Sequence, residues 1–227
     1  MKNVGIIIPI APDENSWEKL WIDLKFLPDD VKIFLVGTKK PTTEIPNKIR
    51  WIQSDLGRAN QMNKGAEIAN CEFLWFLHAD SRFSSNTFKS LTEALTKNPN
   101  NLYYFDLEFL NDGPWLMFIN AIGANIRSHL LGIPFGDQGL FLSKKNFDLI
   151  GGFPNDVPYG EDHVFVWRAR QNGITVSPAN SVIKTSARKY QERGWLKVTL
   201  LHLWLTIKQA WPERQKLKSN TRSKNIH

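Results

Sequence analysis

The sequence is short of cysteine and of long apolar stretches, and both shortages exclude classes of protein. Cys71 is the single cysteine, so an intramolecular disulfide is excluded and a reducing compartment is expected. No window reaches the roughly 18 apolar residues of a membrane-spanning helix. The first apolar run, 4–10, is too short for a secretory signal and contains Pro9. We therefore expect a buried first strand in a cytoplasmic protein.

Net positive charge is absent outside the C-terminal segment, although the whole chain has a net charge of +7. Residues 184–227 carry eleven Lys and Arg against two acidic residues, a balance of +9 that leaves −2 for the rest. A nucleic-acid-binding body needs a basic face, so we expect no nucleic-acid partner. The basic segment suits an anionic membrane surface or solvent.

The order of the apolar runs predicts an α/β fold. Residues 4–10 and 31–36 are continuous apolar runs, typical of strands buried on both faces, with a helical pattern between them. Further strands are expected at 50–53, 73–77 and 102–110, again with helices in between. This β-α-β order favours a Rossmann-like, mostly parallel central sheet flanked by helices. At 227 residues the chain fits a single domain.

Near the C-terminus the pattern predicts a short last strand at 174–176 and a long helix at 195–211, ended by Pro212. We divide the chain into a domain at 1–194 and an amphipathic helix with a basic tail at 195–227. The helix holds many large apolar residues.

Three surroundings would suit that helix: the domain itself, a second subunit in a homodimer, or the membrane. In the last case 195–218 would make a peripheral contact with the inner face of the membrane.

Asp80 follows the expected strand 73–77 directly. Ligands of open α/β sheets bind outside the carboxyl ends of the strands. One or two carboxylates together with phosphate oxygens are usual ligands of Mg²⁺, so Asp80 is a candidate ligand of a divalent cation. His78 lies two residues earlier and points the same way if the strand continues. The alternative is that Asp80 only caps the following helix.

The segment 57–66, GRANQMNKGA, combines features of a phosphate-facing helix start. Gly57 permits a tight turn, Arg58 can bind phosphate, and Asn63 offers both a donor and an acceptor. A helix that begins here would aim its N-terminal amides at an anion. The Gly-Lys-Ser/Thr ending is missing, which excludes a P-loop. A polar surface helix is the alternative.

Glu161 and Asp162 stand at an expected helix start, where the helix dipole alone could explain two carboxylates. The functional interpretation is that Asp162 takes the proton of an acceptor hydroxyl and that Glu161 orients it. Further on, Arg188 belongs to a basic segment that could clamp a diphosphate leaving group. A solvated basic loop is the alternative there.

Seven stretches in this order resemble the family 2 glycosyltransferases, which have the GT-A fold. They are GRANQMNKGA (57–66), FLHAD (76–80), GDQG (136–139), GGFP (151–154), ED (161–162), SAR (186–188) and RGW (193–195). The resemblance is strongest to a small bacterial subgroup described as radical-enzyme-cluster or arsenosugar-biosynthesis glycosyltransferases. It implies a hexosyltransferase-like enzyme that uses a nucleotide-diphosphate sugar and Mn²⁺ or Mg²⁺, and that inverts the sugar's configuration.

The resemblance also implies roles for individual residues. Asp162 would be the catalytic base with Glu161 beside it, and Asp80 would serve the metal with His78 as a second metal residue. The donor would meet Pro9, Arg58, Asn63, Ala79, Asp80 and Arg188, and the acceptor Asp137 and Gln138.

Two positions depart from the family's pattern. Many relatives carry an acidic pair after the second strand, where this sequence has Gly37, Thr38, Lys39 and Lys40. His78 stands where many have a first aspartate, so Asp80 would be the one protein carboxylate on the metal.

Two other functions compete with glycosyl transfer. A nucleotidyltransferase would need a Gly-rich, Arg-containing loop after the first strand, and residues 11–16 have none. The other is a membrane-surface or protein-binding module on a GT-A scaffold, which would use the aromatic and basic residues after 184.

Overall fold

The computed structural model describes residues 3–224, with side chains as far as Leu217. The strands are β1 (Val4–Pro9), β2 (Lys32–Gly37), β3 (Ile49–Gln53), β4 (Phe73–Phe76), β5 (Leu102–Phe109), β6 (Phe141–Ser143) and β7 (Val176–Thr185). The helices are α1 (Trp17–Leu24), α2 (Arg58–Ile68), α3 (Ser85–Lys97), α4 (Met117–Leu131), α5 (Lys144–Ile150), α6 (Glu161–Gln171), α7 (Arg188–Arg193) and α8 (Trp195–Lys224), with the short 3₁₀ helix η1 (Gly136–Gln138) before β6.

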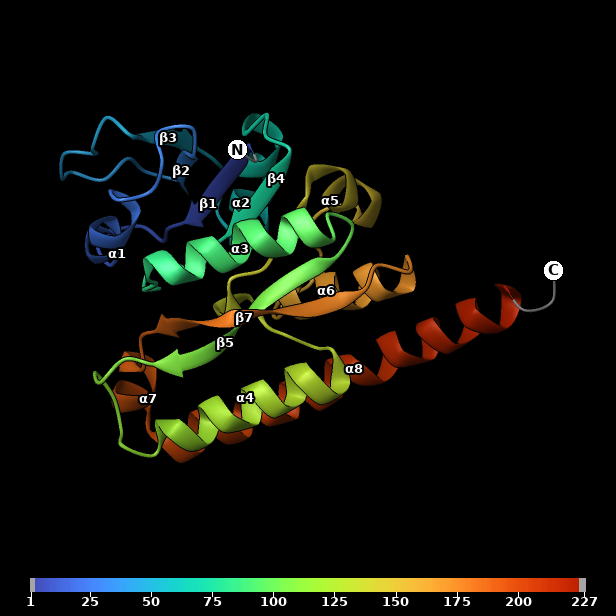
Figure 1. Cartoon of the computed structure of the whole chain (residues 1–227). Coiled ribbons are helices and arrows are strands. Elements are labelled where there is room, and N and C mark those ends of the chain that lie inside the picture. Colours follow the sequence, from blue (N-terminus) through green and yellow to red (C-terminus); the bar gives the residue numbers. More distant parts are fainter. Residues whose placement is uncertain (1–2, 225–227) are drawn as a thin grey trace.

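These strands form one sheet in the order β3-β2-β1-β4-β6-β5-β7 (Figure 1). Neighbouring strands are parallel except at β6, which is antiparallel to both β4 and β5. In the middle of the sheet, Ile7 of β1 lies between Phe34 and Phe76. The carboxyl ends of β1, β4 and β7 therefore point to the same edge, where ligands of such sheets bind.

Alternate residues of the strands feed two separate apolar layers. Ile6 and Ile8 face the layer that α1 and α3 close, whereas Ile7 faces the layer under α2, α5 and α6. All three isoleucines are fully buried. The predicted α/β architecture, a mostly parallel sheet covered by helices on both faces, is confirmed.

Two C-terminal elements differ from the expectation. The last strand runs over Val176–Thr185 rather than 174–176, although it contains Pro178 and a residue with positive φ, Asn180. It is the edge strand of the sheet, next to an irregular register with β5, and an edge tolerates a proline. The last helix does not end at Pro212 but continues to Lys224.

Helices α4 and α8 lie together along one side of the molecule, away from β1, β2 and β3 (Figure 1). Asn120 of α4 joins them, because it donates to Thr199 at 3.0 Å and accepts from the Trp195 indole at 2.7 Å. In the described part of the chain, no helix has the length and hydropathy to cross a membrane. Residues 225–227 of the predicted basic tail lie outside the described residues.

Candidate functional site

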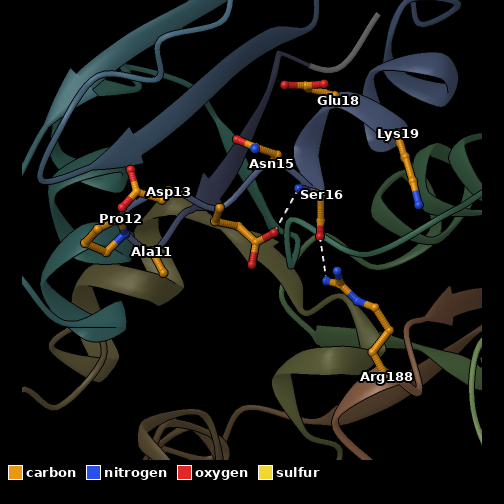
Figure 2. A pocket seen from close by; sticks show the side chains of 9 residues that line it. Ala11, Pro12, Asp13, Asn15, Ser16, Glu18, Lys19 and Arg188 are labelled. Carbon is orange, nitrogen blue, oxygen red and sulfur yellow. Dashed lines mark hydrogen bonds between the residues drawn. The ribbon is translucent and has the colours of Figure 1, made fainter. Parts of the chain in front are cut away.

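An open cleft of about 520 Å³ lies at the carboxyl end of β1. Its walls are residues 11–16 between β1 and α1, the first turn of α1, and Arg188 of α7. Figure 2 shows Arg188 reaching toward Ser16, to whose hydroxyl its Nη2 donates at 2.7 Å. The cleft falls in the usual size range of small-ligand pockets, about 300–1,000 Å³.

Asp80 lies in the turn after β4, in contact with Thr185 at the end of β7. The Thr185 hydroxyl donates to its Oδ1 at 3.3 Å. Burial raises the pKa of the Asp80 carboxyl, the Thr185 hydroxyl lowers it, and nearby Glu14 raises it further; the net direction is upward. Arg188 acts in the opposite direction. Asp80 is therefore influenced by Glu14 and Arg188, two of the five charged residues that line the cleft.

The donor set around Asp80 fits a divalent cation that arrives with its own oxygen ligands. Within residues 3–217, no group of three or more His, Cys, Asp or Glu side chains is arranged to hold a metal ion. A partly buried carboxylate with a second carboxylate nearby is nevertheless a hard-oxygen environment that a cation would stabilise. Mg²⁺ in particular is commonly held by one or two carboxylates and substrate phosphates.

Arg58, at the first turn of α2, gathers a second group of candidate residues. Its Nε donates to Glu161, and its Nη2 lies 3.7 Å from Asp162 Oδ2. Its Nη1 lies 3.2 Å from His78 Nε2. Burial and the Arg58 charge lower the pKa of His78 to about 3, so the imidazole is neutral and accepts this hydrogen bond. The structure thus brings Arg58, His78, Glu161 and Asp162 together.

His78 and Asp80 face different neighbours. Strand β4 ends at Phe76, before either residue, so the continuation that would align the two side chains is absent. His78 belongs to the Arg58 group, whereas Asp80 contacts Thr185.

Asp162 is nearly enclosed, with 7% of the residue exposed. The Gly136 N–H donates to its Oδ2 at 2.5 Å. Burial alone would raise the pKa of the Asp162 carboxyl, but the Arg58 charge and the Gly136 N–H outweigh it and hold the pKa below its ordinary value. The cavity between Arg58, His78 and Asp162 measures only about 10 Å³, which is at most the room for one water, so a sugar hydroxyl does not fit there in this arrangement.

Asp137, in η1, has the opposite environment. Its Oδ1 is shut off from solvent and has no hydrogen-bond partner among the described residues. Burial raises the pKa of Asp137 to about 6, with Arg127 opposing the shift and Asp162 adding to it. The guanidinium of Arg127 lies 3.6 Å from the centroid of the Phe135 ring.

The remaining predicted site residues have structural partners. Gln138 is fully buried, and its amide bonds Ser128 and the Phe105 carbonyl. Asn63 forms two 2.8 Å hydrogen bonds with the backbone of Phe153. An effect of either on a substrate would therefore pass through the loop that it holds.

Pro9 is buried at the end of β1, and Ala79 is 7% exposed beside Asp80. Their backbone lies at and just after the ends of β1 and β4, near the cleft.

Sequence reasoning missed two residues of this site. Glu14 lines the cleft, and its carboxylate accepts from the Ser16 N–H at 2.8 Å. Arg127 approaches Asp137 from α4. The signal for Arg127 was present, because it is the one Lys or Arg between 117 and 131. Glu14 has no such signal, since acidic residues such as Asp13 and Glu14 are ordinary in a surface loop.

The comparisons with known proteins point to one family. Residues 37–153 match the model of "Glycosyl transferase family 2". The fold is similar to S. aureus TarS 1-349 in complex with UDP-GlcNAc, at 16% identity and a TM-score of 0.63, over 83% of this chain and 59% of that one. It is also similar to the mannosyltransferase PcManGT from Pyrobaculum calidifontis in complex with GDP-Man and Mn²⁺, at 15% identity and a TM-score of 0.61, over 81% and 56%.

At these identities the likeness establishes the fold, which is GT-A-like as predicted. The chain spans less than three fifths of the length of either solved structure. No curated protein matches the sequence.

Proposed function

The chain belongs to glycosyl transferase family 2, and on that premise we propose that it moves a sugar from a nucleotide-diphosphate sugar to an acceptor hydroxyl. The observation that carries the proposal is the cleft at the carboxyl end of β1, with Asp80 and Arg188 beside it. The proteins of similar fold include one in complex with UDP-GlcNAc and one in complex with GDP-Man and Mn²⁺. Hexose donors of this kind are therefore the first to test.

On the donor side, Arg188 would bind the diphosphate from the cleft wall and Arg58 would face the nucleotide. Asp80 would hold a divalent cation, Mn²⁺ or Mg²⁺, together with the diphosphate. When bound, that cation would neutralise charge that develops on the leaving diphosphate. Pro9 and Ala79 would shape the cleft at the ends of β1 and β4.

On the acceptor side, we assign proton removal to Asp162. The acceptor oxygen would attack the anomeric carbon from the face opposite the diphosphate, and the bond from that carbon to the diphosphate oxygen would break, with inversion. Asp162 would receive the hydroxyl proton once Arg58 has moved from its carboxylate, and Glu161 would keep a contact with Arg58. Asp137 and, through the loop, Gln138 would shape the acceptor side.

Membership of the radical-enzyme-cluster or arsenosugar subgroup remains a proposal that rests on the seven sequence stretches. A cytoplasmic location at the inner face of the membrane is also proposed, with 1–194 as the catalytic unit and 195–227 as its attachment. A homodimer through the same helix is the alternative partner.

The test is donor hydrolysis without an acceptor. The protein is incubated with a panel of nucleotide sugars and Mn²⁺, and the released nucleoside diphosphate is measured. We expect slow release from at least one donor, and a loss of about 100-fold or more in Asp80→Asn. Asp30→Asn, which changes an exposed carboxylate between α1 and β2, is the matched control and should keep full activity. Equal hydrolysis by both variants would contradict the role of Asp80.

A further inference from the structure

Helix α4 has its polar side turned inward and its apolar side turned outward. The Asn125 amide accepts a hydrogen bond from the Leu107 N–H on β5 and donates one to the Leu107 carbonyl. Ser128 and Arg127 donate to the side-chain oxygen of the buried Gln138. The opposite side is a stripe of large apolar residues, each between 46% and 77% exposed: Phe118, Ile119, Ile122, Ile126 and Leu130. Helices that cover a core in water show the reverse arrangement.

Helix α8 repeats this inversion. Its inward side presents His202 to Tyr190, Gln209 to His163 and Glu213 to Gln171. Glu213 is only 7% exposed. Its outward side carries six large apolar residues, each between 55% and 69% exposed: Leu196, Leu200, Leu203, Trp204, Ile207 and Trp211.

The two helices contact each other through Asn120, so their outward sides belong to one region of the molecule (Figure 1). We call the two sets of exposed apolar residues together the α4–α8 surface. Their exposures hold with the rest of the described chain in place, so neither helix covers the other's apolar residues. Exposed apolar surface on this scale marks a site of association.

The positive charge beside the α4–α8 surface indicates which kind of partner this surface binds. Residues 184–217 contain eight Lys and Arg against Glu192 and the buried Glu213. Lys197 and Lys208 are exposed among the outward residues of α8, and the Lys208 ammonium lies 4.8 Å from the centroid of the Trp204 ring. Two copies packed through this region would bring basic surfaces together, whereas anionic lipid would neutralise them.

We propose that the α4–α8 surface docks on an anionic lipid bilayer. The helices lie in the plane of the interface, with the apolar residues among the acyl chains and the lysines at the headgroups. Trp204 and Trp211 fit the headgroup level, where tryptophan is enriched. Neither helix reaches the length and hydropathy of a spanning segment in its described residues, in keeping with binding to one leaflet. This docking does not depend on the proposed sugar transfer.

The experiment is flotation with vesicles of phosphatidylcholine, with or without about 30% phosphatidylglycerol. We expect the wild-type chain to float with the anionic vesicles. Partitioning should fall about tenfold or more in Ile122→Ser/Ile126→Ser/Trp204→Ser/Ile207→Ser, because four outward apolar groups are lost. Lys197→Gln/Lys208→Gln should weaken binding to the anionic vesicles alone.

Phe26→Ser/Leu149→Ser is the matched control, since both residues are exposed apolar side chains outside α4 and α8, and it should float like the wild type. Unchanged melting temperatures would show that the variants fold. Wild-type chain that stays in the soluble fraction with both kinds of vesicle would overturn the proposal. So would a concentration-dependent dimer, measured by light scattering, that the fourfold variant alone abolishes. Because no sugar donor is present, a failure here leaves the glycosyltransferase proposal standing.

Discussion

At the scale of single residues, two aspartates of the site are held in opposite electrostatic environments. Arg58 and the Gly136 N–H keep the pKa of Asp162 low against the effect of burial, whereas burial raises the pKa of Asp137 to about 6. Pairs of carboxyl groups whose pKa values are pushed apart often divide acid and base roles. Asp162 is thus a carboxylate at neutral pH, and Asp137 is close to a change of protonation state.

The raised pKa of Asp137 predicts a pH-dependent cost to stability. Folding favours its protonated form, a contribution that is complete below the ordinary pKa of 3.8 and is lost as the pH rises through about 6. The side chain that Asp137→Asn introduces is uncharged at every pH, so above pH 6 this variant should be more stable than the wild type by about 2–3 kcal/mol, or about 5–10 °C in Tm. Thermal unfolding between pH 4 and pH 8 measures this.

The difference between Asp137→Asn and the wild type should vanish near pH 4. A difference in stability of the same size at every pH would show that the pKa of Asp137 is not raised in the folded protein.

For single residues, the sequence predicts which side chains have suitable polar groups better than it predicts which atoms those groups contact. The sequence singles out Asp80 as a candidate because the end of a strand is a local feature. Asn63 and Gln138 have the donors and acceptors that a substrate needs, but both are used inside the protein, by Phe153 and Ser128. The choice between a ligand and a backbone partner 90 residues away, as for Asn63, is made by the tertiary fold.

At the scale of elements, η1 and α6 form one unit around the candidate base. Gly136 begins η1, and its N–H binds Asp162 in the first turn of α6. A Cβ atom on Gly136 would lie 2.9 Å from Asp162 Oδ2 and 3.0 Å from His78 Nε2. The absence of a side chain at 136 is therefore what lets the two elements approach.

Gly136→Ala should displace the Asp162 carboxylate and weaken its hydrogen bond. We expect a loss of about 1–3 kcal/mol in stability from the forced contact. Turnover should fall about tenfold or more, while the KM for the donor changes little, because Gly136 is not among the residues that line the donor cleft. Thermal unfolding and donor kinetics together test this.

The control is Gly123→Ala on α4, where nothing lies within 4 Å of the added Cβ. It should be neutral or stabilising, since alanine favours helix over glycine by about 1 kcal/mol. Equal kinetics of the two alanine variants would exclude the proposed contact between 136 and 162.

The elements themselves were predictable to different degrees. Helices and buried strands as far as β5 follow from apolar periodicity. The position of β6, antiparallel between β4 and β5, depends on partners distant in sequence. Pro212 was expected to end the last helix, because proline lacks the N–H of the helical ladder, yet α8 continues through it.

At the scale of the whole molecule, net positive charge and exposed apolar residues gather in one region. The segment 184–227 has a balance of +9, and the rest of the chain has −2. Helix α8, one half of the α4–α8 surface, belongs to this basic segment, and so does Arg188, which begins α7 and lines the cleft. Composition alone could locate the basic segment, but not the outward face of α4, because an amphipathic pattern does not say which side meets the core.

The central claim is that the cleft and Asp80 together bind the nucleoside diphosphate of a sugar donor. The most direct measurement is the thermal shift with UDP and GDP, with and without Mn²⁺, on the wild type and on Asp80→Asn. At about 100 times the dissociation constant, the better nucleotide with Mn²⁺ should raise the Tm of the wild type by about 5–10 °C. The shift should largely disappear without Mn²⁺ or in Asp80→Asn. No shift with either nucleotide, or an equal shift in Asp80→Asn, would contradict the claim.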